Sequence, residues 1–132
     1  MKKGIDVSEN NGVVDWEAAR AAGIEFAIVR ASYGRTEIDE RFLENVEGAH
    51  AAGLICGAYH YSYALNEQQA CEEAAHCRKV IEDAGVLLEL PVFYDMEDAD
   101  QYKKNHGFAF DREEITAMCR VFLENIRLDC GV

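Results

Sequence analysis

With 132 residues, the chain has the length of one ordinary domain with a core of its own. Apolar residues make up 49% of it and charged residues 29%, values typical of a folded globular protein rather than a disordered one. The net charge is −12 and no cluster of Lys and Arg offsets it, so a nucleic-acid partner is disfavoured. No apolar run reaches the roughly 18 residues needed to span a bilayer, so we expect no membrane partner either.

The first residues and the cysteines indicate where the chain is made. Lys2 and Lys3 are followed by Asp6 and Glu9 rather than by an apolar segment, so we expect synthesis in the cytoplasm without a signal peptide. The five cysteines are odd in number, irregularly spaced and without a CxxC motif. This pattern favours small, mostly buried thiols in a reducing compartment over disulfides or a metal site. The cysteines are Cys56, Cys71, Cys77, Cys119 and Cys130.

Short β-rich segments alternate with helical patterns along the chain. We expect strands at residues 4–8, 25–31, 55–63 and 90–96. Helices are expected over residues 16–22, 39–52, 66–84 and 111–128, capped in that order by Asp15, Asp39, Asn66 and Asp111. The first three would stop at Gly23, Gly53 and Gly85, each followed by an apolar strand. Repeated βα units predict a parallel sheet with right-handed crossovers.

Two α/β architectures fit this order: a doubly wound open sheet and a (β/α) barrel. Polar residues gather where each strand ends, and catalytic groups of (β/α) barrels lie at this end of several strands. The loop at residues 8–12 has neither a dinucleotide-binding nor a P-loop pattern. We therefore predict an incomplete (β/α) TIM-like barrel of about four βα units, plus the start of a fifth strand at residues 128–132.

Asp95 and Glu97 are the most suggestive pair for chemistry. On a strand, side chains two residues apart point to the same face, so the two carboxyls would lie side by side next to Phe93. Ionising both is costly, and the pKa of one should rise. A protonated acid beside a carboxylate suits glycosidic cleavage, because one group protonates the leaving oxygen while the other stabilises the cationic sugar. The alternative is that acidic residues mark the start of a loop.

Other polar residues have both a functional and a structural interpretation. Asp6 would point toward Asp95 if their strands are neighbours, or else anchor a loop. Tyr59, Tyr61 and Tyr63 alternate on one face, where aromatic rings can stack on sugars, although tyrosines also favour strands. His60 faces the other way and is expected to be structural. Arg30 could balance the acidic cluster or contact substrate.

Four motifs together resemble one known family. Gly4-Ile5-Asp6-Val7-Ser8, followed by Asn10, Gly12, Asp15 and Trp16, resembles the opening of glycoside hydrolase family 25. These are the Chalaropsis-type lysozymes, or N-acetylmuramidases, which include many phage endolysins. The segments at residues 26–34, 57–61 and 94–98 resemble the second, third and fourth strands of that family, in the same order. The resemblance covers nearly the whole chain, so we expect residues 1–132 to be the N-terminal part of such a catalytic domain.

The resemblance implies hydrolysis of the β-1,4 bond between N-acetylmuramic acid and N-acetylglucosamine in peptidoglycan, outside the cytoplasm, after secretion or lysis. It implies that Glu97 is the general acid, that Asp95 is its partner and assists the acetamido group of the substrate, and that Asp6 has an electrostatic and positioning role. It implies no cofactor and no metal. We expect Arg30, Tyr33, Tyr59 and Tyr61 to bind substrate.

The chain also departs from the family pattern. A complete (β/α) barrel takes 200 residues or more, and a shorter one exposes strand edges and core. We therefore expect a homo-oligomer that covers the open barrel. Two other functions stay open: a non-catalytic glycan-binding or assembly module derived from a lysozyme, and a small α/β enzyme with a divalent metal on Asp95, Glu97 and Asp98.

Overall fold

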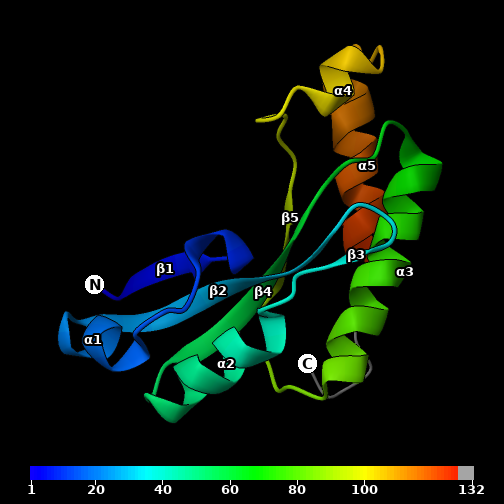
Figure 1. The fold of residues 1–132 in the computed structure, drawn as a ribbon. Helices are drawn as coiled ribbons and strands as arrows, with labels where there is room; N and C mark the ends of the chain where they lie inside the picture. The colour runs from blue at the N-terminus through cyan, green and yellow to red at the C-terminus, as the bar shows by residue number, and fades with distance from the viewer. Residues whose placement is uncertain (128–132) are drawn as a thin grey trace.

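The structure is a computed structural model that describes residues 1–127. Four parallel strands form its sheet in the order β1-β2-β4-β5 (Figure 1): β1 (Lys3–Val7), β2 (Ile24–Tyr33), β4 (Ile55–Tyr61) and β5 (Val92–Asp95). A short strand, β3 (Glu37–Ile38), pairs antiparallel with the end of β2. The helices are η1 (Glu9–Asn11), α1 (Trp16–Ala21), α2 (Phe42–Ala51), α3 (Glu67–Ala84), α4 (Tyr102–Asn105) and α5 (Arg112–Asn125).

The strand order decides between the two predicted architectures. Each long parallel strand pairs with the next one along the chain, as in a (β/α) barrel, and the order does not reverse as in a doubly wound sheet. The prediction of an incomplete barrel is confirmed: within residues 1–127, β1 and β5 lie at the two ends of the sheet and do not pair with each other. The fifth strand predicted at residues 128–132 lies outside the described residues.

Most helix boundaries follow the predicted caps and glycines. Asp15, Asn66 and Asp111 each accept a hydrogen bond from a backbone N–H in the first turn of α1, α3 and α5. The glycines after α1, α2 and α3 have left-handed φ angles of 96°, 89° and 67°, which end each helix at little steric cost: Gly23, Gly53 and Gly85. Helix α5 ends at Asn125, three residues before the predicted end.

Asp39 does not cap a helix as predicted. Helix α2 has Arg41 at its N-cap, without a side-chain cap. The Asp39 carboxylate is buried and accepts hydrogen bonds from Arg30 Nε at 2.9 Å and from the backbone N–H groups of Glu9 and Arg41 at 3.0 and 2.9 Å. A buried carboxylate needs such partners, and the guanidinium of Arg30, nine residues earlier on β2, supplies the compensating charge.

A β-bulge in β2 changes which side chains face the inside of the curved sheet. Arg30 is paired with Tyr59 of β4, but Ser32 is paired with the next residue, His60, so the register shifts at Ala31. The extra residue in the bulge reverses the alternation. Arg30 therefore points to the inner side, whereas Ser32 turns to the outer side, where its hydroxyl lies 2.7 Å from Nδ1 of His60.

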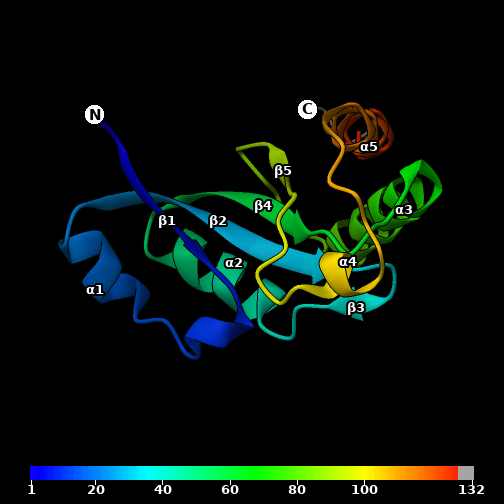
Figure 2. The same ribbon diagram turned by 90° about the horizontal axis from the view of Figure 1, so that it is seen from above.

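The main core lies between the outer face of the sheet and the helices. Helices α3 and α5 run side by side in both views (Figures 1 and 2), and Phe122 of α5 stacks on Tyr94 of β5 with ring centroids 4.0 Å apart. Cys56 and Cys77 are buried in this core; Cys71 and Cys119 are half-buried, and Cys130 lies outside the described residues. Within residues 1–127, no helix is both long enough and apolar enough to cross a membrane.

Candidate active site

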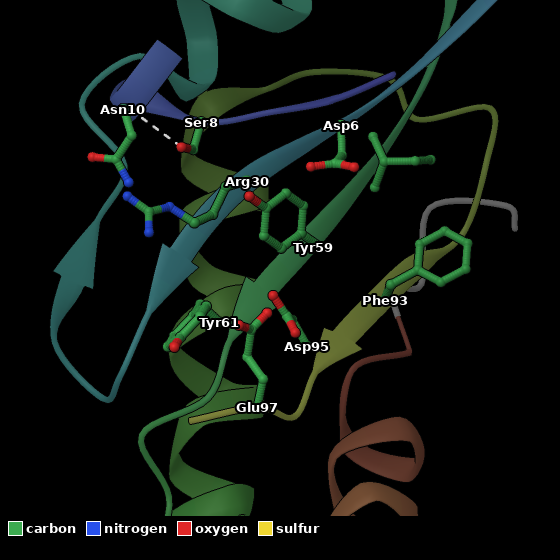
Figure 3. A pocket seen from close by; sticks show the side chains of 10 residues that line it. Asp6, Ser8, Asn10, Arg30, Tyr59, Tyr61, Phe93, Asp95 and Glu97 are labelled. Carbon is green, nitrogen blue, oxygen red and sulfur yellow. Dashed lines mark hydrogen bonds between the residues drawn. The ribbon is translucent and has the colours of Figure 1, made fainter. Parts of the chain in front are cut away.

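The inner face of the sheet carries a pocket of about 530 Å3 at the carboxyl ends of its parallel strands (Figure 3). Strands β1, β2, β4 and β5 and the segments after them contribute its lining. The lining residues are Asp6, Ser8, Asn10, Ile28, Arg30, Tyr59, Tyr61, Phe93, Asp95 and Glu97. Six of the seven predicted site residues thus meet in one place, all except Tyr33, as in a barrel whose strands all point the same way.

Asp95 and Glu97 lie together in this pocket. Asp95 is the last residue of β5 and is paired with Tyr61 of β4, and its carbonyl oxygen accepts a hydrogen bond from Ser62 N at 3.0 Å. Glu97 follows two residues later and turns its carboxyl toward that of Asp95 (Figure 3). The two-residue spacing brings the carboxyls together even though Glu97 lies beyond the end of the strand.

The predicted rise in one pKa of the pair is confirmed, and it falls on Asp95. Burial, a hydrogen bond with Glu97 and the negative charge of Glu97 raise the pKa of Asp95 to about 7, and the charge of Lys103 opposes this rise. Two carboxyls in contact resist double ionisation, so Asp95 keeps its proton up to about neutral pH.

Asp6 reaches the pocket by a different route from the one predicted. Its strand is not a neighbour of β5, because β2 and β4 lie between β1 and β5. The curvature of the sheet nevertheless turns Asp6 to the same concave side as Asp95 (Figure 3). Its negative charge contributes to the raised pKa of Asp95. The site therefore depends on sheet curvature rather than on direct pairing of these strands.

The tyrosines of β4 divide between two pockets. Tyr59 and Tyr61 line the pocket of the carboxyl pair, and burial raises the pKa of Tyr59 to about 12, so its phenol keeps its proton. Tyr61 Oη accepts a hydrogen bond from Ala99 N at 3.2 Å. Tyr63 lies beyond the strand, donates to Asp100 at 2.7 Å, and lines a neighbouring pocket of about 560 Å3.

Arg30 and Tyr33 are held by the residues around them. Arg30 forms ion pairs with Asp39 at 2.9 Å and Glu9 at 3.2 Å, so the charge it balances is theirs rather than that of the carboxyl pair. Its guanidinium also lies 4.4 Å from the centre of the Tyr33 ring. Tyr33 lines the neighbouring pocket together with Tyr63, not the pocket of the carboxyl pair.

His60 lies on the outer side of the sheet, as predicted from strand alternation. It is fully buried, burial lowers its pKa, and its Nε2 lies 3.4 Å from the Glu73 carboxylate. Glu73, on α3, accepts hydrogen bonds from the Ser62 hydroxyl at 3.0 Å, from Tyr63 N at 2.7 Å and from the Tyr94 hydroxyl. This buried network fixes the chain where β4 ends, directly behind the pocket.

Two residues shape the site in ways that the sequence did not predict. Lys103 is 1% exposed and donates to the carbonyl oxygens of Ser62 and Glu97. Asp98, a candidate metal ligand from its sequence position, accepts instead from Lys103 N at 2.8 Å and Lys104 N at 3.1 Å. No periodic pattern marks either role. Within residues 1–127, no group of three or more His, Cys, Asp or Glu side chains is arranged to hold a metal ion.

A paired acid and carboxylate at the carboxyl ends of the strands of a barrel-like parallel sheet is an arrangement that many glycoside hydrolases use. The model of glycosyl hydrolases family 25 matches residues 5–132. The chain belongs to this family.

Individual relatives agree with this assignment. The chain is 34% identical over 95 residues to the autolytic lysozyme of Clostridium acetobutylicum and 42% identical over 60 residues to lysozyme M1 of Streptomyces globisporus. These matches cover 72% and 46% of the chain but 28% and 20% of the two lysozymes. The modular autolysin LytC of Streptococcus pneumoniae, solved with a synthetic peptidoglycan ligand, superposes with a TM-score of 0.82 at 27% identity. That match covers 95% of this chain and 29% of LytC.

Proposed function

We propose that residues 1–132 form the N-terminal part of a lysozyme-type catalytic domain, which hydrolyses the β-1,4 bond between N-acetylmuramic acid and N-acetylglucosamine in the cell wall. The observation that carries the proposal is the Asp95–Glu97 pair, which keeps a proton up to about neutral pH at the base of an open, tyrosine-lined pocket. Glycosidic cleavage needs a proton donor and a carboxylate on either side of one bond. Relatives that act on peptidoglycan support the same substrate.

The roles within the pair are those that the family resemblance implies. In the free pocket the raised pKa of Asp95 favours a proton on this carboxyl, which is hydrogen-bonded to Glu97. We assign Glu97 as the general acid: it receives this proton from Asp95 and passes it to the leaving glycosidic oxygen as the bond to the sugar breaks. Asp95, now ionised, stabilises the developing positive charge or the acetamido group that attacks it. Asp6 adds negative charge at the same face of the pocket.

Substrate contacts fall to the residues around the pair. Tyr59 and Tyr61 offer rings and hydroxyls to a sugar. Arg30 lines the pocket and is oriented by Asp39 and Glu9. Its remaining N–H groups would donate to a sugar hydroxyl or acetamido oxygen. Tyr33, in the neighbouring pocket, would contact a more distant part of the glycan strand.

The test is clearing of purified cell walls by the chain and by Glu97→Gln. An amide cannot give up the proton, so clearing should fall by on the order of 10²–10⁴-fold while the fold is kept. Asp95→Asn should be severely impaired, and Asp6→Asn impaired to a smaller extent. Glu47→Gln, on the exposed face of α2, is the matched control and should clear like the unaltered chain.

Two outcomes would overturn parts of this proposal. Clearing by Glu97→Gln at the unaltered rate would remove Glu97 from the acid role. Retention of the chain on cell walls without any clearing would favour the second candidate, a glycan-binding module.

We also propose that the chain by itself forms a homodimer that covers the open side of the sheet. The outer edge of β5 is unpaired within residues 1–127, and Phe93 on this strand is 47% exposed. Unpaired strand edges and exposed apolar side chains favour association. A second copy would cover both at a gain of roughly 25 cal/mol per Å2 of apolar surface. Such a dimer would also narrow access to Asp95 and Glu97.

A further inference from the structure

A buried lysine lies directly behind the carboxyl pair. Lys103 belongs to α4, a four-residue helix in the segment after β5, and its side chain is the largest that is fully buried among the described residues. The Asp98 carboxylate accepts hydrogen bonds from Lys103 N and Lys104 N and so fixes the start of this helix. Lys103 therefore points inward while its neighbour Lys104 stays exposed.

The ammonium group of Lys103 connects the ends of two strands. Its Nζ donates to Ser62 O at 2.6 Å and to Glu97 O at 2.9 Å. Ser62 follows β4 and Glu97 follows β5, and the last backbone bond between these segments runs from Ser62 N to Asp95 O. The ammonium thus links the segments after β4 and β5 beyond the last backbone hydrogen bond between them. The link is made at Glu97, the proposed general acid.

Charged groups from several elements face this ammonium. Burial lowers the pKa of Lys103, and nearby carboxylates act in the opposite direction. Glu73 lies on α3, Asp98 and Asp100 follow β5, and Asp95 ends that strand. The thiol of Cys119 on α5 is also close enough for the charge of Lys103 to lower its pKa, against the larger effect of burial. A buried ammonium without neighbouring carboxylates would lose its proton, so this acidic surround favours its charged form.

We propose that Lys103 is a positioning residue for the carboxyl pair: its ammonium fixes the backbone of Glu97 against the end of β4. From this position its charge also acts on Asp95. The catalytic consequence rests on the proposed muramidase function, but the structural and electrostatic effect does not.

The first experiment needs no substrate. Carbon-13 NMR would follow the titration of the Asp95 carboxyl in the free chain, in Lys103→Met and in Lys104→Met. Asp95 faces Glu97, Lys103 and Asp6. Removal of the positive charge should raise the pKa of Asp95 by about one pH unit in Lys103→Met, whereas Lys104→Met should leave it unchanged. An unchanged pKa of Asp95 in a folded Lys103→Met chain would overturn the proposal.

A second measurement covers the case in which Lys103→Met does not fold. In the unaltered chain, the nitrogen-15 resonance of Lys103 Nζ should shift as Asp95 titrates, because the two charges interact. An Nζ resonance that is insensitive to this step would overturn the proposal without any variant.

Kinetics then test the catalytic consequence. If the chain clears cell walls, Lys103→Met should lower kcat by roughly 10²-fold through misplacement of Glu97 with little change in KM, and its pH profile should move in the direction of the Asp95 pKa. A change in KM alone would contradict a positioning role. If the unaltered chain does not clear cell walls, the proposed function fails, and the NMR result still decides the role of Lys103.

Discussion

At the scale of single residues, the raised pKa of Asp95 makes stability depend on pH. Asp95 titrates near 7 in the folded chain, far above its ordinary value of 3.8. The folded state therefore binds a proton more tightly than the unfolded state between these values. The contribution of Asp95 is most favourable below about pH 4, declines as the pH rises, and is lost above about pH 7. Ionised Asp95 thus lowers the stability of the folded chain at about neutral pH and above.

Asp95→Asn should remove this cost. We expect the substitution to stabilise the chain by about 1 kcal/mol more at pH 8.5 than at pH 5.5, after a discount for the part of the carboxyl that remains exposed. Urea unfolding at both pH values measures the difference. Asp83→Asn, on the exposed surface of α3, is the control and should show the same effect at both. Equal effects of Asp95→Asn at the two pH values would contradict the raised pKa.

At the scale of the elements, helix α3 holds the end of β4 through one carboxylate. Burial by itself would raise the pKa of Glu73, but His60, Tyr94 and Tyr63 N hold it below the ordinary value. The same carboxylate accepts from the Ser62 hydroxyl. The helix therefore fixes the backbone segment to which Lys103 also binds.

Two adjacent glutamates on α3 test this role. Glu73→Ala should destabilise the chain by about 3 kcal/mol, because it leaves buried hydroxyl and N–H donors without an acceptor. Glu72→Ala removes an exposed ion pair with Arg35 and should cost about 0.5 kcal/mol. Urea unfolding of both variants measures the contrast. A similar loss in the free energy of unfolding for both variants would show that the buried network around Glu73 does not stabilise the chain more than an exposed ion pair does.

At the scale of the whole molecule, association of the 132-residue chain is opposed by its charge of −12. We expect light scattering at micromolar concentration to give a dimer whose stability rises with salt, because screening weakens the repulsion between the copies. Phe93→Lys should weaken the dimer, since it places a charge on the covered face. Leu87→Lys, at an exposed position in the loop before β5, should not. A sharp monomer peak with a cooperative melt would contradict dimerisation.

Much of the fold could be predicted because its signals are local. Caps such as Asp15 and Asn66 and stops such as Gly23 and Gly85 act within one turn of helix, and the structure confirms them. The alternation of apolar strands and helices was sufficient to predict parallel βα units. The side-by-side placement of Asp95 and Glu97 was predictable from their two-residue spacing, although Glu97 lies beyond the end of β5.

The sequence by itself thus determined the order of the elements and the identity of the carboxyl pair. The tertiary structure decided which distant groups meet. Sheet curvature, not strand pairing, brings Asp6 to the inner face, and the bulge in β2 sends Ser32 to the outer one. Asp39 forms an ion pair with Arg30 instead of capping a helix, and the buried Lys103 donates to the carbonyl oxygen of Glu97. A buried charge must find partners wherever the folded chain places them, and no local pattern records where those partners will be.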